Sequence, residues 1–137
     1  MATLQALKVS SGTEQMPGVG DGQSCKMVAS TYSWTSAPAS GDIIQSALIQ
    51  AGSVITDVVV THSGFGASGA FSVGYGGSTA YYAAAAAAVT AGVVRMSVGN
   101  IPYIPTTNDT VDVVMTGTGA SATGTVTIIV YFQSRNA

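Results

Sequence analysis

The feature that most constrains this chain is a succession of short runs of Val, Ile and Thr separated by Gly and Ser. The stretch 41–64, GDIIQSALIQAGSVITDVVVTHSG, holds two such runs around Ala51-Gly52, and the same pattern continues to Phe132. Short β-branched runs bounded by turn residues are typical of strands. A βαβ arrangement would need longer helical inserts, so the sequence predicts an all-β antiparallel β-sandwich or jelly roll.

We expect seven or eight strands after residue 24. The expected ranges are Cys25 to Trp34, Asp42 to Ile49, Ser53 to His62, Ala70 to Tyr75, Val93 to Val98, Asp109 to Thr116 and Thr125 to Phe132. A tight turn at Gln50-Ala51-Gly52 joins the second and third ranges, and the last two ranges are expected to pair across 117–124. One segment departs from this pattern. Tyr81-Tyr82 precedes six alanines, and alanine is the best helix former, so we expect a short Ala-rich helix or an extended loop there.

The alternation of apolar and polar residues within these runs assigns a core face to each strand. The predicted core consists of Ile44, Leu48, Ile55, Val59, Phe71, Val73, Met96, Val111, Val113, Ile128 and Val130. The single cysteine, Cys25, is expected to be a small buried residue at the start of a strand. One cysteine excludes an internal disulfide framework.

The first 24 residues differ from the rest in composition. They contain Pro17 and four glycines and show no sustained apolar period, so they cannot bury enough surface to fold alone. We expect an extended N-terminal arm over 1–24 and a β-sandwich domain over 25–137. The scattered apolar residues of the arm, Leu4, Leu7, Val9 and Met16, are predicted to dock on a partner. Tyr81, Tyr82 and Ala85 are predicted to form a second contact, because small side chains allow a neighbouring backbone to approach.

The low charge of the chain indicates contact with other protein. Charged residues make up 7% of the sequence, against a usual level of about a quarter, and a monomer needs charge to remain dispersed. This predicts a homo-oligomer. The four basic residues, Lys8, Lys26, Arg95 and Arg135, are scattered and the net charge is −2, which argues against nucleic-acid binding.

The longest apolar run, Tyr81 to Val89, is shorter than the ~20 residues of a membrane-spanning helix. The N-terminus lacks the pattern of a secretory signal. We therefore expect no membrane partner and synthesis in a reducing cytoplasm.

No motif in the sequence predicts an enzyme, a cofactor or a metal site. The glycines of 64–69 match G-x-G-x-x-G, but a strand follows them instead of a helix, so they are interpreted as turn formers. His62, the only histidine, is expected to be an exposed polar residue at a strand end. Asp57 should lie on the opposite face of that strand. Asp109 and Asp112 are too few for a calcium loop. Trp34, Tyr32, Tyr81, Tyr82 and Tyr103 could stack on sugar rings, although such aromatics are more often core or interface residues.

The order of three segments resembles small structural proteins of tailed bacteriophages. The segments are GDIIQSALIQAGSVITDVVV, FSVGYGGSTAYY and DTVDVVMTGTGASATGTVTIIVYF. In that family a Gly-Asp pair and a strand precede a Gly- and Tyr-rich segment, and a terminal hairpin follows. The resemblance covers 41–132, about two-thirds of the chain, and includes no catalytic signature.

The resemblance implies a capsid decoration (cement) protein at the surface of the virion, which forms a homotrimer and binds the major capsid protein. The N-terminal arm would then lie on a neighbouring capsomer, by analogy with the family. The alternative is a tail or head fibre component with a glycan- or receptor-binding β-domain. A hydrolase domain is the third class, and no site for it can be assembled from the sequence.

Overall fold

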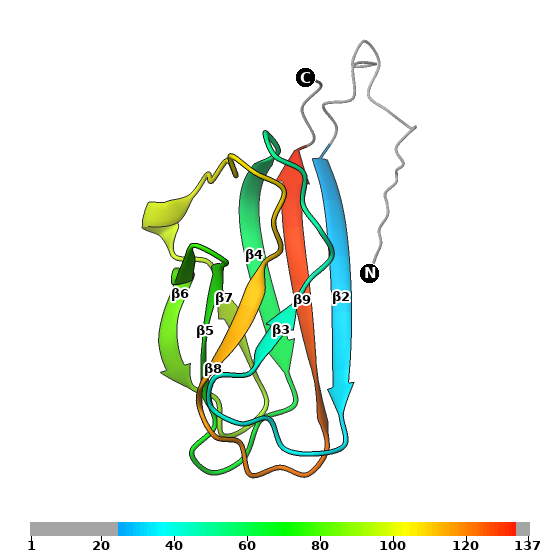
Figure 1. The fold of residues 1–137 in the computed structure, drawn as a ribbon, viewed down its shortest axis with the longest axis vertical. Coiled ribbons are helices and arrows are strands. Elements are labelled where there is room, and N and C mark those ends of the chain that lie inside the picture. Colours follow the sequence, from blue (N-terminus) through cyan, green and yellow to red (C-terminus); the bar gives the residue numbers. More distant parts are fainter. Residues whose placement is uncertain (1–24, 134–137) are drawn as a thin grey trace.

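The computed structural model describes residues 25–133, which form two layers of strands (Figure 1). The strands are β2 (Cys25–Trp34), β3 (Ile43–Gln45), β4 (Val54–His62), β5 (Ala70–Tyr75), β6 (Ser78–Ala87), β7 (Gly92–Arg95), β8 (Asp112–Gly117) and β9 (Gly124–Gln133), with a 3-10 turn, η1 (Val98–Asn100), after β7. One sheet has the order β2-β9-β4-β7 and the other β3-β8-β5-β6. Every pair is antiparallel. The prediction of an antiparallel β-sandwich of seven or eight strands is confirmed.

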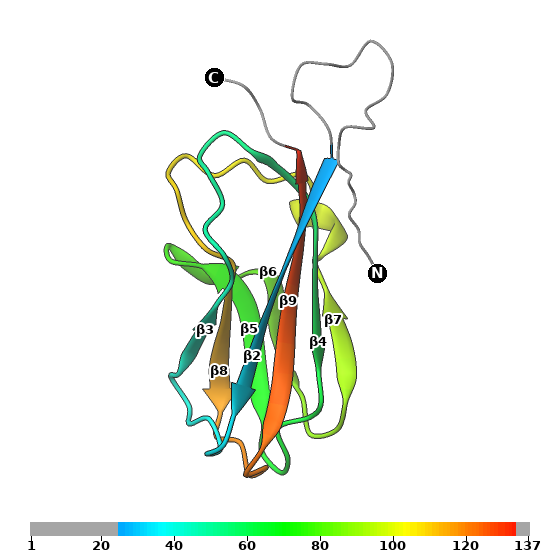
Figure 2. The ribbon, with the colours of Figure 1, turned by 90° about the vertical axis from the view of Figure 1, so that its right-hand side faces the viewer.

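The strands pair in a nested order. β2 pairs with β9, β3 with β8, β4 with β7 and β5 with β6, so each pair encloses the next one along the chain. Only β5 and β6 are consecutive strands of one sheet, and every other connection crosses between the layers (Figure 2). The expected tight turn between β3 and β4 is present, with Gly52 at φ +83°, and it joins strands of different sheets. The expected pairing of the last two strands is wrong, because β8 and β9 lie in different sheets.

The observed boundaries of two strands agree with the boundaries predicted from the sequence. The expected ranges Cys25–Trp34 and Ala70–Tyr75 match β2 and β5. The expected strand from Asp42 to Ile49 is reduced to three residues. The reason is that the pairing becomes irregular after β3, although the chain still runs beside the segment that leads into β8. Ser46 exchanges hydrogen bonds with Val111, and Ile49 forms a separate bridge to Asp109.

The Ala-rich segment is a strand, so the expected helix or loop is wrong. β6 contains both tyrosines and the alanines up to Ala87, and it pairs with β5 through Phe71–Ala86 and Val73–Ala83. A helix of this length is marginal in isolation. β5 supplies hydrogen-bond partners that the isolated segment lacks, so tertiary pairing overrides the intrinsic propensity of alanine.

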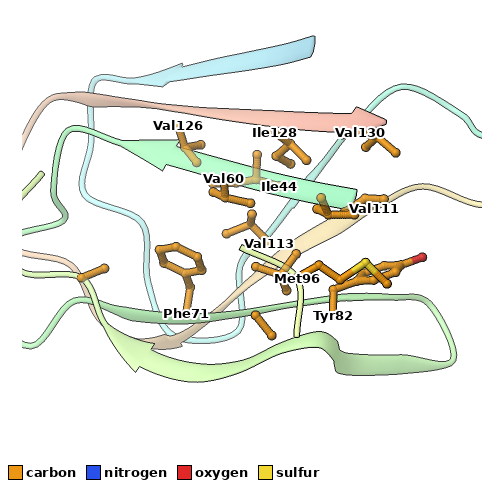
Figure 3. Close-up of a cluster of buried hydrophobic side chains, with 14 of the residues drawn as sticks. Ile44, Val60, Phe71, Tyr82, Met96, Val111, Val113, Val126, Ile128 and Val130 are labelled. Atoms are coloured by element: carbon orange, nitrogen blue, oxygen red, sulfur yellow. The ribbon is translucent and has the colours of Figure 1, made fainter. Parts of the chain in front are cut away.

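The core lies between the sheets, as Figure 3 shows. The structure confirms that the following predicted core residues are buried: Ile44, Ile55, Phe71, Val73, Met96, Val111, Val113, Ile128 and Val130. The prediction that Leu48 is buried is wrong, because Leu48 lies in the β3–β4 connection and is 63% exposed. The prediction for Val59 is also wrong, since Val59 is only half-buried on the outer face, while Val58 and Val60 point inward.

A β-bulge in β4 explains the error at Val59. The pairing of β4 with β9 shifts between Ile55 and Asp57, where one extra residue is inserted. Because of this extra residue, the side chains that point inward are no longer those two, four and six residues after Ile55. After the bulge the inward positions are Val58, Val60 and His62. Asp57 and His62 do lie on opposite faces, as expected.

Cys25 is exposed, so its expected burial is wrong. It begins β2, an outermost strand that pairs only with β9 among the described residues. Its register partner is Gln133, at the end of β9. Both ends of the described chain are therefore at the same end of the sandwich (Figure 1).

Candidate functional site

The structure describes only three of the seven residues that the sequence predicts to contact a partner. Leu4, Leu7, Val9 and Met16 lie outside the described residues. Tyr81, Tyr82 and Ala85 all lie on β6, but they differ in exposure. Tyr82 is 1% exposed and cannot reach a partner, which corrects its assignment to an interface. Tyr81 is half-buried and Ala85 is exposed, so both remain accessible.

Four tyrosines gather at the end of the sandwich where β5 turns into β6. We call Tyr75, Tyr81, Tyr82 and Tyr103 the tyrosine cluster. The rings of Tyr75 and Tyr103 are stacked with centroids 5.1 Å apart, and Tyr81 lies 4.8 Å from Tyr103. Tyr82 meets Tyr81 edge to face at 5.4 Å. The cluster is built from the β5–β6 hairpin and the β7–β8 connection, two segments that are not adjacent in sequence.

A small pocket of about 210 Å³ opens beside the tyrosine cluster. Tyr75, Tyr82 and Tyr103 are among the residues that line it, and its polar lining includes Asp109 and three threonines, Thr106, Thr107 and Thr110. The Asp109 carboxylate accepts hydrogen bonds from the backbone N–H groups of Gly76 and Thr110. The pocket thus combines aromatic surface with one fixed carboxylate.

Two phenols of this pocket have a raised pKa. Burial raises the pKa of Tyr82 far above its usual value, and neighbouring tyrosines and Asp109 raise it further. Burial also raises the pKa of Tyr103, together with its side-chain hydrogen bond to Tyr75. Among the residues that line the pocket, Asp109 is the one with a carboxylate or a basic side chain.

A different aromatic cluster closes the opposite end of the sandwich. Trp34 stacks on Phe65 at 4.7 Å, and its Nε1 donates a hydrogen bond to the Ser121 carbonyl. Trp34 is buried, so it is not available to stack on a sugar ring. Among the other candidates for that role, Tyr82 is also buried, Tyr81 and Tyr103 are half-buried, and Tyr32 is exposed.

His62 belongs to this second aromatic cluster and is not the exposed polar residue that we expected. Its ring lies 5.3 Å from Phe71 and 5.8 Å from Phe65. Its Nδ1 is buried and has no hydrogen-bond partner among the described residues. The bulge in β4 turns His62 inward, as it does Val60. Replacement by alanine should therefore cost more than the loss of about 1 kcal/mol expected for an exposed side chain, because it leaves a cavity.

We expect the protein to lose stability as the pH falls below the usual histidine range. Burial lowers the pKa of His62, so the unfolded chain takes up a proton more readily than the folded chain. The stability from neutral His62 is present above its unfolded pKa and is lost as the pH falls towards its folded value. Urea midpoints at about pH 7.5 and about pH 5.5 should differ less in His62→Leu than in the wild type. Equal differences would contradict this assignment.

The outer face of the sheet β2-β9-β4-β7 is unusually poor in charge. Three rows of side chains cross it: Met27, Tyr131 and Asp57; Ala29, Ile129, Val59 and Arg95; and Thr31, Thr127, Thr61 and Val93. The only charged groups in these rows, Asp57 and Arg95, form an ion pair with each other. Val93 is 62% exposed. An antiparallel sheet with one solvated face usually alternates apolar and polar residues more strictly.

The glycines of 64–69 are turn residues, because Gly64 and Gly66 have positive φ angles and the strand β5 follows them. Within 25–133, no three His, Cys, Asp or Glu side chains are grouped so that they could hold a metal ion. None of the helical segments in that range has the length and hydropathy needed to cross a bilayer.

Similar folds occur in solved phage capsid structures. A chain of the cyanophage Pam1 capsid asymmetric unit aligns with a TM-score of 0.74 and 20% identity, over 96% of this chain and 100% of that one. A chain from the capsid of Ralstonia phage GP4 gives 0.65 and 20%, over 91% and 94%. A chain from the acid-stable capsid of Helicobacter pylori bacteriophage KHP30 gives 0.53 and 14%, over 80% and 93%. At these identities the likeness shows a shared fold. No protein-family model matches the sequence, and no curated protein matches it.

Proposed function

We propose that this chain is a structural protein of a phage virion and acts as a capsid decoration (cement) protein. The observation that carries the proposal is the near end-to-end match to a chain of a phage capsid asymmetric unit. The two chains are therefore similar in length, and a chain of this size forms one domain. A one-domain subunit is suited to attach to a shell built by a larger protein, which would be the major capsid protein.

The strand order supports a virion role. The eight strands of the two sheets pair in a nested order, from β2 with β9 to β5 with β6, and this order supports our proposal that the sandwich is a jelly roll. Jelly rolls occur in viral capsid and lectin domains. The fold alone does not define a function, so the argument also depends on the surfaces that the fold presents.

The outer face of β2-β9-β4-β7 supports self-association. Its cross-strand rows are apolar or uncharged except for the Asp57–Arg95 pair, which is neutral as a unit. A face of this kind can pack against a neighbouring copy of the chain without leaving an unpaired charge buried. A homotrimer on the shell is the oligomer that we propose.

The N-terminal arm, residues 1–24, is proposed to dock on the capsid or on a neighbouring subunit. Its four predicted anchors are Leu4, Leu7, Val9 and Met16, and the arm joins the domain where β2 begins. An arm that becomes ordered on binding adds contact area beyond that of the compact domain. Deleting 1–22 should leave the melting of the domain nearly unchanged and should weaken attachment. Failure of the truncated protein to fold would show that the segment belongs to the domain.

The role on the capsid is tested by adding the purified protein back to heads that lack it. Heads with the protein should withstand heat or low salt better than heads without it. The isolated protein should sediment as an oligomer, and Ile129→Glu should dissociate it, because the change puts a charge on the outer face. Ile43→Glu is the matched control, since Ile43 is 54% exposed on β3 in the other sheet.

Two results would overturn the proposal. Heads of equal stability with and without the protein would exclude a cement role, and binding of the free protein to glycans would then support a fibre component. The homo-oligomer would be excluded if the wild-type protein were a monomer in solution at micromolar concentration and also bound to the capsid as a monomer.

A further inference from the structure

The pocket beside the tyrosine cluster has the composition of a cation-binding site. Tyr75 and Tyr103, both half-buried, form its accessible aromatic wall, and Asp109 supplies a carboxylate. We propose that this pocket binds an ammonium group, either on a small molecule or on a lysine side chain of a partner protein. This inference is independent of the proposed function on the capsid.

The aromatic wall provides the first attraction. A cation within about 6 Å of the centre of an aromatic ring is drawn to the negative potential of the ring face, and the gain increases when water is excluded. The rings of Tyr75 and Tyr103 stack on each other, and the buried Tyr82 packs against both. The two rings are therefore held in position before a ligand arrives, so binding requires little further loss of side-chain entropy.

The carboxylate provides the second attraction and has no cationic partner within residues 25–133. The one ion pair in that range joins Arg95 and Asp57, at a different site. Asp109 instead accepts backbone N–H groups, one on each oxygen: Oδ2 from Gly76 and Oδ1 from Thr110. These bonds fix the carboxylate, and each oxygen keeps a lone pair for a ligand. A cation near it gains charge-assisted hydrogen bonds and Coulomb attraction.

Size and charge restrict the ligand. A pocket of about 210 Å³ is smaller than the usual range of roughly 300–1,000 Å³ for drug-sized ligands, so it suits a single compact group. Asp109 would repel an anion. The hydroxyls of Thr106 and Thr107 could also face the hydroxyls of a neutral sugar, so a sugar is the competing ligand that the experiment must separate from an ammonium ion.

Binding is tested on the full chain by calorimetry and by NMR shifts of the tyrosine rings. The probes are choline, its neutral isostere 3,3-dimethylbutan-1-ol, Nα-acetyl-lysine methylamide and methyl glucoside. Choline and the isostere have nearly the same shape and differ in charge, so their comparison isolates the contribution of the cation. Asp109→Asn removes the charge of the pocket. Asp42→Asn is the matched control, because Asp42 also accepts a backbone N–H and lies at the opposite end of the sandwich.

We expect choline to bind at least about tenfold more tightly than its isostere. Asp109→Asn should remove most of that difference in affinity, while Asp42→Asn retains it.

Choline binding without binding of the lysine derivative indicates a small-molecule ligand. Binding of both, with choline displacing the protein from capsids, indicates a lysine of a partner. Equal binding of choline and the isostere, tighter binding of methyl glucoside, or no binding of either ammonium probe would overturn the proposal. Tyr103→Leu should weaken choline binding, and unchanged binding would exclude the aromatic wall.

Discussion

Replacing Gly74 by alanine is expected to destabilise the domain by about 3 kcal/mol or more. Gly74 lies in β5, opposite the beginning of β6. A Cβ atom there would overlap the carbonyl oxygen of Ser78 and the carbonyl carbon of Thr79, and it would lie 2.8 Å from the Ala80 nitrogen. All three are backbone atoms of a paired strand, so they cannot rotate away as a side chain could. The β5–β6 hairpin would have to open, and it carries three residues of the tyrosine cluster, Tyr75, Tyr81 and Tyr82.

The matched control for this prediction is Gly99→Ala. A Cβ atom at Gly99 meets no other atom within 4 Å, so the change should alter the free energy of unfolding by no more than about 0.5 kcal/mol. Urea unfolding followed by Trp34 fluorescence measures both variants. Similar midpoints for Gly74→Ala and the wild type would show that β5 and β6 are not packed as closely as described.

The sequence predicted those parts of the fold that depend on local pattern. β2 and β5 begin and end at the expected residues because each is a β-rich run bounded by turn residues. Nine of the predicted core residues are buried for the same reason, since alternation along a strand is a local property. The all-β class followed from the spacing of these runs.

The parts that failed depend on distant contacts. Ala83 to Ala87 form a strand only because β5 lies beside them, and the local sequence favours a helix. The inward turn of His62 depends on a bulge near Thr56, which no turn residue marks. The nested pairing places β8 and β9 in opposite sheets, although only a short connection separates them. Such pairings depend on the packing of the whole sandwich, so a short stretch of sequence does not predict them.

The pocket could be predicted only in part. Tyr81, Tyr82 and Tyr103 stood out as aromatic residues, but their mutual contact did not. Tyr75 was expected only as the end of a strand, and Asp109 only as the start of a strand and as a rejected calcium ligand. These residues meet because the β5–β6 hairpin and the β7–β8 connection leave the sheets at the same end. The same end holds the start of β2, so the tyrosine cluster and the proposed cation site lie at the pole of the domain where the described chain begins (Figure 1).

Replacing Ile128 by alanine is expected to cost about 2–4 kcal/mol, because it removes three buried carbon atoms and leaves a cavity between the sheets. Ile128 is fully buried in β9, between Ser30 of β2 and Val60 of β4. The neighbouring residue Ile129 provides an internal comparison, because it has the same side chain on the opposite face of the same strand. It is only half-buried, so Ile129→Ala should cost about 1 kcal/mol or less. Denaturation midpoints of the two variants at one protein concentration measure the difference, and a larger loss for Ile129 would mean that β9 presents its other face to the core.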